Sequence, residues 1–410
     1  MEKVTGYYVP YFKEEDYGCS VNLIHVHLDQ VLDSIKKEQF SVKETKQVTD
    51  FTTPTFDVVV KSFNRQVTDV YYEDNRGNKV ETPTKNIAIE MMISPSDGSP
   101  FLFSMKTLFN TYSDPYELDI QATNLTVDGK EVELTVTKTY DKYESKADVF
   151  KLDHFKATNG QEYNYAYYQP EKESSTLVVW LHGVGEGGID HTDPYVTLLA
   201  NKVTALVSTE FQNTLGGTHV LVPQCPTFWM DRTGKGLVDG RIAEADGTSF
   251  YTDSLHECIN DYRQKHSIKK VVICGCSNGG YMTLLFALKY KDEYDVYVPI
   301  CEAIPDKYIR DEQLEGIKDL PLYFIYSKDD TTVVPSIHEE PTIKRLQAMK
   351  ASNLHSFVSD VVIDTTGKFN DENDNPVQYD GHWSWIYFFN NEASKSNQPT
   401  IWQWIKDQLD

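Results

Sequence analysis

The chain has 410 residues, of which 40% are hydrophobic and 12% aromatic, and its formal net charge is −23. This length suits two domains, and this composition is rich enough for packed cores, which argues against a largely disordered protein. The 62 acidic against 39 basic residues disfavour nucleic acid and anionic membranes as partners, because both would repel the protein.

Neither end of the sequence carries a signal-peptide or transit pattern, and no run of about 18 apolar residues occurs that could span a bilayer. The sequence as it stands therefore predicts a soluble protein of the cytoplasm. Secretion is the alternative for a chain from which a leader has been removed.

Residues 1–150 show short strands separated by turns. Alternating or β-branched runs occur at residues 21–27, 56–62, 67–72, 87–92 and 132–137, and turn-forming residues at 75–78, 96–98 and 128–129. A helical repeat is suggested only at residues 28–35. The pattern is typical of an antiparallel β-sandwich of immunoglobulin-like type.

From about residue 160 the pattern changes to strands that alternate with helices. Strands are expected at residues 163–168, 177–181, 219–223, 270–276, 296–301, 322–326 and 357–363, and helices at 191–208, 251–264, 281–290, 341–350 and 400–408. This alternation predicts a mostly parallel sheet covered by helices on both faces. The polar stretch at 143–159 suits a boundary, which gives a β-sandwich domain at 1–150 and an α/β domain at 151–410.

Ser277 stands where the apolar run 270–276 ends, directly before a helix, and is bracketed by Gly275 and Gly279. A serine at the apex of a strand, a tight turn and a helix is the G-x-S-x-G nucleophile elbow, in which small neighbours leave the hydroxyl exposed above the sheet. The pattern predicts nucleophilic acyl transfer. The alternative is a glycine-rich turn without chemistry.

A serine nucleophile needs a base, and the base needs an acid that orients it. With this kind of elbow the chain order is nucleophile, acid, histidine. The strand at 322–326 is followed by Asp329 and Asp330. We favour Asp330 as the acid, because it stands just past a buried strand, and keep Asp329 as its rival.

Three histidines follow the acid, and the best candidate for the base is His382. It stands in a loop near the C-terminus, after Gly381 and beside large aromatic residues. His338 opens a helix with charged neighbours and His355 begins a strand, so both are more simply surface residues. The alternative for His382 is a structural role in an aromatic cluster.

Acyl transfer also requires N–H donors for the developing oxyanion. The glycine-rich loop 181–188 follows a predicted strand, and the expected donors are the backbone N–H groups of Val184 and Asn278. A phosphate-binding role for this loop fails, because the lysine and hydroxyl of a P-loop are missing. His182 is expected to be a buried organiser of the loop.

No metal or organic cofactor is expected. The six cysteines show no framework or zinc spacing and are interpreted as reduced core thiols. His25 and His27 could look like a pair of metal ligands. Their alternation with apolar residues is explained more simply by a strand with one solvated face.

Four motifs carry a resemblance to a known family: residues 182–186, 223–231, 275–280 and 380–386. With them the chain resembles bacterial α/β-hydrolases described as carboxylesterases or predicted peptidases related to prolyl oligopeptidases. Some members carry an N-terminal immunoglobulin-like domain. The resemblance covers residues 160–410, and in the first 150 residues it rests on the strand pattern alone.

The resemblance implies Ser277, Asp330 and His382 as a catalytic triad and esterase activity on short acyl esters. The sequence departs from the family at the end of the strand before the acid. The residues there are usually small or begin with histidine, whereas here they are Tyr-Ser-Lys at 326–328. The acid assignment is therefore the one left most open, with Asp329 next to Asp330.

These observations predict a serine carboxylesterase that acts through an acyl-enzyme. Its expected substrates are small molecules, namely short-chain or carbohydrate-linked esters. Trp229 and Trp383 are candidate walls of the substrate pocket, although large aromatic residues are more often part of a core. A serine peptidase is one alternative. Another is a non-catalytic protein whose tyrosine-rich N-terminal domain binds carbohydrate or a partner. That domain could also shape the active-site mouth or mediate homo-oligomer contacts.

Overall fold

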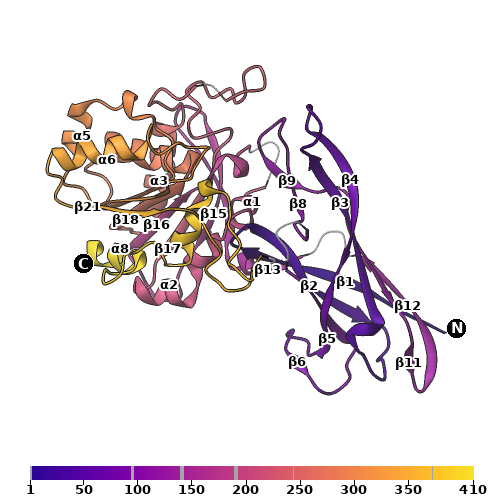
Figure 1. Cartoon of the computed structure of the whole chain (residues 1–410). Coiled ribbons are helices and arrows are strands. Elements are labelled where there is room, and N and C mark those ends of the chain that lie inside the picture. The colour runs from indigo at the N-terminus through magenta and orange to yellow at the C-terminus, as the bar shows by residue number, and fades with distance from the viewer. Residues whose placement is uncertain (1, 94–96, 139–142, 189–192, 243, 372) are drawn as a thin grey trace. The chain divides into compact units, whose positions relative to one another are not determined.

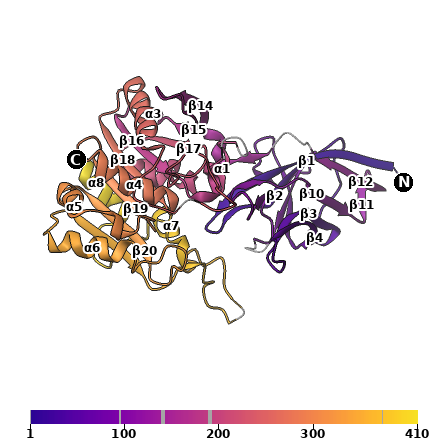
Figure 2. The same cartoon turned by 90° about the horizontal axis from the view of Figure 1, so that it is seen from above.

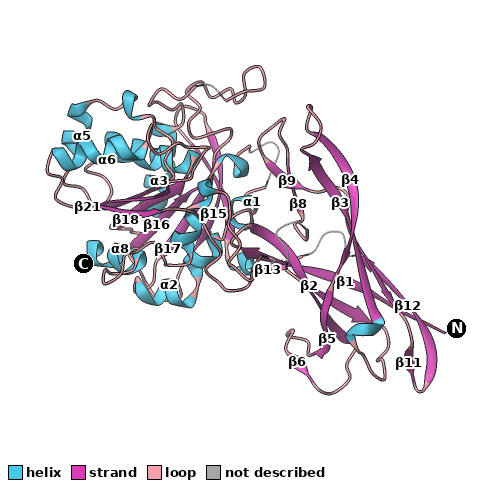
Figure 3. Ribbon diagram, in the orientation of Figure 1, coloured by secondary structure: helices cyan, strands magenta, loops and turns pink. Residues whose placement is uncertain are grey.

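The structure, a computed structural model, describes residues 2–93, 97–138, 143–188, 193–242, 244–371 and 373–410. The chain divides into two compact units. Unit 1 comprises Met1–Met105 and Asn110–Asp148, and unit 2 comprises Lys106–Phe109 and Val149–Asp410. Strands dominate unit 1, whereas the α-helices gather in unit 2 (Figure 3).

Unit 1 is built from a large sheet of order β11-β12-β1-β2-β7-β5-β6, with β13 beside β1, a second sheet of order β10-β3-β4, and the pair β8 and β9. Its strands are β1 (Glu2–Glu15), β2 (Gly18–Leu28), β3 (Phe40–Asp50), β4 (Asp57–Arg65), β5 (Val67–Glu73), β6 (Lys79–Val80), β7 (Asn86–Met91), β8 (Phe101–Phe103), β9 (Asn110–Tyr112), β10 (Tyr116–Ala122), β11 (Leu125–Val127), β12 (Lys130–Lys138) and β13 (Glu144–Ser145). The predicted all-β N-terminal region is confirmed.

The expectation of purely antiparallel pairing is wrong at β1. This strand runs parallel to β12, in a register from Glu2 opposite Val132 to Tyr8 opposite Lys138. The two strands are more than a hundred residues apart in the chain, so no turn constrains their direction. The expected turn at 128–129 does join β11 to β12, whereas the one at 96–98 begins outside the described residues.

The helix suggested at residues 28–35 does not form. Leu28 still belongs to β2, and the following residues make an irregular loop. The Asp29 carboxylate accepts bonds from the N–H and hydroxyl of Thr5, and that of Asp33 accepts the N–H of Gly129. Side chains that bond to distant backbone groups in this way hold the segment open and prevent the local bonds of a helix.

Unit 2 contains a sheet of order β14-β15-β17-β16-β18-β19-β20-β21, whose last six strands in that order are parallel. Its strands are β14 (Lys151–Lys156), β15 (Glu162–Tyr168), β16 (Thr176–Leu181), β17 (His219–Gln224), β18 (Lys270–Cys276), β19 (Val296–Ile300), β20 (Leu322–Ser327) and β21 (Leu354–Ser359). Strands β17, β19 and β20 are buried along their whole length, as expected when both faces of a parallel sheet are covered.

Helices cover both faces of this sheet (Figure 1). They are α1 (Val196–Leu199), α2 (Thr209–Thr214), α3 (Thr252–Lys265), α4 (Asn278–Lys289), α5 (Asp311–Ile317), α6 (Glu339–Ala348), α7 (Trp385–Phe389) and α8 (Ile401–Leu409). Helices α3, α5 and α6 lie on one side and α2 and α8 on the other, and Figure 2 shows α4 along β19. None of the helices in the described part of the chain has the length and apolar composition needed to cross a lipid bilayer.

The strands and helices that were predicted in unit 2 are found close to their expected bounds except in two places, whereas β14, α2, α5 and α7 were not predicted. Residues 191 and 192 lie outside the described residues, and the rest of the helix expected at 191–208 is broken into α1 and a 3-10 helix, η4 (Val203–Val207). Ser208 does not end that helix but caps the next one, since its hydroxyl accepts the N–H of Phe211. The strand expected at 357–363 instead covers Leu354–Ser359.

Candidate active site

Ser277 stands between β18 and α4 in a backbone conformation that L residues rarely adopt, with φ 56° and ψ −116°. Its N–H donates to the carbonyl of Ile300 at 2.8 Å, and its own carbonyl accepts the N–H of Tyr281 at 2.8 Å. The residues before and after it are buried, whereas Ser277 itself is partly exposed. The turn therefore exposes Ser277 to solvent while its neighbours stay buried.

The two glycines of the elbow are required for space. A Cβ atom on Gly275 would lie 2.5 Å from the carbonyl oxygen of Leu181, and one on Gly279 only 1.9 Å from the same oxygen. The end of β16 therefore approaches the elbow too closely for any side chain at these positions. The left-handed strain falls on Ser277, which is flanked by glycines that have ordinary φ values.

The three residues predicted to act together are in contact. His382 Nε2 lies 2.9 Å from Ser277 Oγ, and His382 Nδ1 lies 2.7 Å from Asp330 Oδ2. Since a carboxylate can only accept, Nδ1–H donates to Asp330 and Nε2 is left to accept the serine proton. This is the geometry of nucleophile, base and orienting acid.

The structure distinguishes Asp330 from its rival. Asp330 is buried, and its second oxygen accepts the N–H groups of Thr332 and Val333, each at 2.8 Å. Asp329 instead accepts bonds from the hydroxyl of Ser327 and, at 3.3 Å, from the amide of Gln378. Asp330 therefore orients the base, whereas Asp329 supports the loops beside it.

The loop that carries His382 is itself held in place. The carboxylate of Asp380 accepts the N–H of His382 at 2.9 Å, and the edge of Trp385 packs against the imidazole ring with centroids 5.5 Å apart. A Cβ atom on Gly381 would lie 2.3 Å from Asp329 Oδ1, so only glycine permits this approach. The loop therefore holds the backbone of His382 through Asp380 and its ring through Trp385.

The other two histidines that follow Asp330 in the chain, His338 and His355, make structural contacts. His338 Nδ1 lies 2.9 Å from the carbonyl of Val334. His355 packs against Tyr323 and Trp404. Neither contact involves the serine.

The two predicted oxyanion donors each begin a helical turn. Val184 opens a 3-10 helix, η3 (Val184–Glu186), and Asn278 opens α4, and the first N–H of a helix has no partner within that helix. A Cβ atom on Gly183 would lie 3.8 Å from Cys276 Sγ. The glycine-rich loop is therefore close to the residue that precedes Ser277.

Replacing Val184 by proline should lower kcat by about 100-fold to 1000-fold, the usual cost of one oxyanion donor. Proline lacks the N–H but suits the first position of a helix, and Gly183 has the extended conformation that a residue before proline prefers (φ −70°, ψ −170°). Steady-state kinetics on a short ester measures the loss. Val184→Ala retains the N–H and is the matched control, and equal rates for the two variants would exclude this N–H as a donor.

His182 organises the glycine-rich loop, as predicted. It is fully buried; its Nδ1–H donates to the carbonyl of Gly183 at 2.6 Å, and its Nε2 accepts the N–H of Cys225 at 2.9 Å. Burial lowers the pKa of His182 to about 4, so the ring stays neutral and retains both bonds at physiological pH.

Phe109, which belongs to unit 2, was not anticipated near this loop. Its ring stacks on Phe228 with centroids 5.1 Å apart, and a Cβ atom on Gly188 would lie 2.5 Å from the same ring. Gly188 is therefore limited to glycine by both space and its φ of +86°. Because Phe109 is distant in sequence from the loop it packs on, no local pattern could indicate this contact.

The prediction that Trp229 lines the substrate pocket is wrong. Trp229 is fully buried and packs against His182 and Tyr163, with ring centroids 5.2 and 6.3 Å apart, because it forms part of the hydrophobic core. Trp383 is partly exposed beside His382 and stacks on Tyr379. Of the two, only Trp383 remains available to a substrate.

Two buried carboxyl groups near the triad were also missed by sequence analysis. Glu302 follows β19, Glu339 opens α6, and both are fully buried. Burial raises the pKa of Glu302 to about 8, and burial together with the charge of Glu302 raises the pKa of Glu339 well above its ordinary value. The pair therefore retains at least one proton at neutral pH, which limits the negative charge near Asp330.

All six cysteines are buried and free. Within the described ranges, no group of three or more histidine, cysteine, aspartate or glutamate side chains is arranged to hold a metal ion.

Comparison with known proteins supports the fold. A family model for serine aminopeptidases of the S33 class matches residues 223–313, a segment that includes the elbow. A thermostable esterase of known structure matches with a TM-score of 0.68 and 21% identity over 96% of this chain and 97% of that chain. An esterase from Pyrococcus furiosus gives a TM-score of 0.43 and 14% identity over 64% of this chain and 93% of its own. No curated protein matches the sequence.

The chain thus has the α/β-hydrolase fold with an all-β N-terminal part, as predicted. The partial family match and the contacts among Ser277, His382 and Asp330 together indicate an enzyme of the serine hydrolase class.

Proposed function

We propose that this serine hydrolase is a carboxylesterase that cleaves short-chain or carbohydrate-linked esters. The observation that carries the proposal is the hydrogen-bonded series from Ser277 Oγ through His382 to Asp330, with distances of 2.9 and 2.7 Å. His382 takes the proton of Ser277 as the hydroxyl attacks the ester carbonyl. The N–H groups of Val184 and Asn278 stabilise the oxyanion, and Asp330 stabilises the imidazolium that forms.

Collapse of this intermediate releases the alcohol, which receives its proton from His382, and leaves an acyl group on Ser277. A water molecule then gives up a proton to His382 and attacks the acyl group, which restores the serine and releases the acid. The side chains described here are sufficient for every proton transfer in this cycle.

An esterase is favoured over a peptidase by the structure of unit 1. Its strands form two sheets and a short hairpin, which is not a propeller that could filter peptides by size. The solved structure that matches this chain with a TM-score of 0.68 is described as a thermostable esterase. The peptidase alternative is retained because the family model that matches residues 223–313 describes serine aminopeptidases.

The test is hydrolysis of p-nitrophenyl acetate, butyrate and octanoate beside an aminoacyl p-nitroanilide. We expect turnover of the esters that falls as the acyl chain lengthens, and little turnover of the anilide. Cleavage of the anilide alone would make the enzyme a peptidase. Turnover of neither, with no labelling of Ser277 by a fluorophosphonate, would favour the non-catalytic binding protein.

A further inference from the structure

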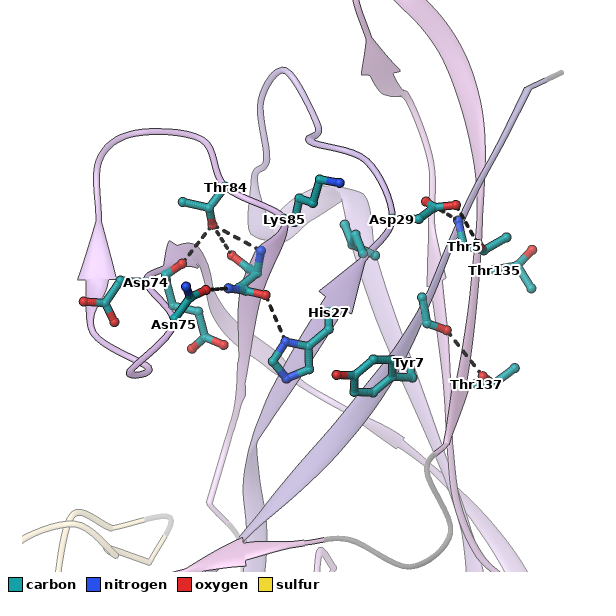
Figure 4. Close-up of a pocket in the computed structure, with 14 residues that line it drawn as sticks. Thr5, Tyr7, His27, Asp29, Asp74, Asn75, Thr84, Lys85, Thr135 and Thr137 are labelled. Atoms are coloured by element: carbon teal, nitrogen blue, oxygen red, sulfur yellow. Dashed lines mark hydrogen bonds between the residues drawn. The ribbon is translucent and has the colours of Figure 1, made fainter.

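Unit 1 contains a pocket of about 990 Å³ that the catalytic proposal does not use (Figure 4). It lies on a face of the large sheet and is lined mainly by polar side chains around one exposed aromatic ring. A volume of this size falls within the range of small-molecule sites.

The centre of the pocket is one cross-strand row. Thr137 of β12, Tyr7 of β1, His27 of β2 and Asn86 of β7 are register partners from strand to strand. Because paired residues point to the same face of a sheet, the four side chains stand side by side. Figure 4 shows Thr137, Tyr7 and His27 in this order across the sheet.

Tyr7 supplies an exposed aromatic surface at the middle of this row. Its side chain is 44% exposed, and its ring lies beside that of His27, with centroids 4.8 Å apart and planes at 33°. An aromatic ring left in water at the floor of a pocket offers apolar area and a negative π-face to a ligand. The C–H groups on one face of a sugar ring match both properties.

A relay of hydrogen bonds orients the polar groups beside the ring. His27 Nδ1–H donates to Asn86 Oδ1 at 2.9 Å, and Asn86 Nδ2–H donates to Asn75 Oδ1 at 2.9 Å. The relay leaves His27 Nε2 as an acceptor and the Asn75 amide nitrogen as a donor, and neither atom has a partner among the residues that the structure describes. One fixed acceptor and one fixed donor suit neighbouring hydroxyl groups.

Charges line the rest of the pocket. The carboxylate of Asp29 is held by the hydroxyl and N–H of Thr5 at 2.7 and 2.9 Å, and Asp74 and Lys85 also line the wall. Glu73 also lines the pocket, and three carboxylates against a single lysine disfavour an anionic ligand. A carboxylate readily accepts bonds from two hydroxyls at once.

A peptide is a poorer fit than a sugar. Peptides commonly bind to sheets by adding a strand to an open edge. The four strands that carry the row, β12, β1, β2 and β7, are each paired on both sides. The pocket therefore offers side chains on a closed face and no free backbone edge.

We propose that this face of unit 1 binds a neutral saccharide, with a pyranose ring stacked on Tyr7 and its hydroxyls bonded to His27, Asn75 and Asp29. The pocket is lined by residues of unit 1 alone, whereas Ser277 belongs to unit 2, and the proposal holds whether the enzyme proves to be an esterase or a peptidase. Binding at this pocket would keep the enzyme attached to a glycan.

The test is native electrophoresis of the full chain carrying Ser277→Ala in gels that contain soluble xylan, mannan, mixed-linkage β-glucan or galactan. At least one of these neutral polymers should retard the protein, whereas heparin, a polyanion, should not. Tyr7→Ala should weaken the binding about tenfold, because the stacking surface is lost. Tyr7→Phe preserves that surface and should retain most of the affinity.

Phe51→Ala is the matched control, because Phe51 is 66% exposed in the same unit and does not line the pocket. Asn75→Ala, on an exposed turn where folding is not at risk, should weaken binding about fivefold through loss of one hydrogen bond. The proposal is overturned if none of the four neutral polymers retards the protein, if heparin alone does, or if Tyr7→Ala and Phe51→Ala behave alike while both retain the parent melting temperature.

Discussion

Replacing Ser277 by alanine should lower ester turnover by roughly 10⁶-fold in kcat, the scale on which serine hydrolases lose activity without their nucleophile. No other hydroxyl is placed against His382 Nε2 among the described residues, so no second group could form the acyl-enzyme. Labelling by a fluorophosphonate should disappear together with turnover. Residual activity within tenfold of the parent would exclude Ser277 as the nucleophile.

Ser277→Gly should be measured beside Ser277→Ala, because both variants lack the nucleophile but should differ in stability. At φ 56° and ψ −116° a Cβ atom is strained by roughly 1–3 kcal/mol, and alanine retains that strain whereas glycine relieves it. Glycine also loses more freedom on folding, so the net gain should be about 1 kcal/mol. For a domain of this size the gain corresponds to a melting temperature about 2–4 °C above that of Ser277→Ala.

Both variants should be equally inactive, and calorimetry should distinguish them. A glycine variant that melts below the alanine variant would mean that the elbow is not strained as the structure has it. The comparison therefore tests the backbone conformation of the elbow independently of the chemistry.

Asp330→Asn should lower kcat by about 10⁴-fold, a cost observed when the acid of such a triad becomes an amide. The asparagine oxygen would continue to accept the N–H groups of Thr332 and Val333. Its NH₂ group would then face His382 Nδ1, which would have to accept rather than donate. The proton would move to Nε2, and the imidazole could no longer accept the proton of the serine.

Asp329→Asn is the matched control for this experiment, because it makes the same chemical change one residue earlier. Asp329 holds Ser327 and Gln378, and an asparagine oxygen can accept the same bonds. We therefore expect a loss of less than about tenfold. Steady-state kinetics on one short ester compares the two variants, and a larger loss for Asp329→Asn would reverse the assignment of the acid.

The chemistry of the site could be predicted from the sequence because each of its parts has a local signature. An apolar run that stops at a serine between two small residues is visible within eleven residues, and so is a histidine that follows glycine in an aromatic loop. The order of nucleophile, acid and base along the chain then limited the candidates to two aspartates. Only the tertiary contacts distinguished Asp330 from Asp329, since both follow the same strand.

Other features depend on residues that are distant in the chain, and the sequence could not indicate them. The segment 28–35 has the spacing of a helix but is held open by bonds to Thr5 and Gly129. Trp229 was expected to face a substrate, yet it is buried against His182. In both cases a partner outside the local pattern decided the outcome.

The sequence by itself thus determined the alternation of strands and helices in unit 2, the all-β character of unit 1, and the choice of Ser277 and His382 as nucleophile and base, because periodicity and short motifs are local properties. The tertiary structure decided the parallel pairing of β1 with β12, the burial of Glu302 and Glu339, and the row in which Tyr7 meets His27 and Asn86. Register between distant strands and the loss of solvent around a carboxyl group arise only when the chain has folded, so no stretch of sequence contains them.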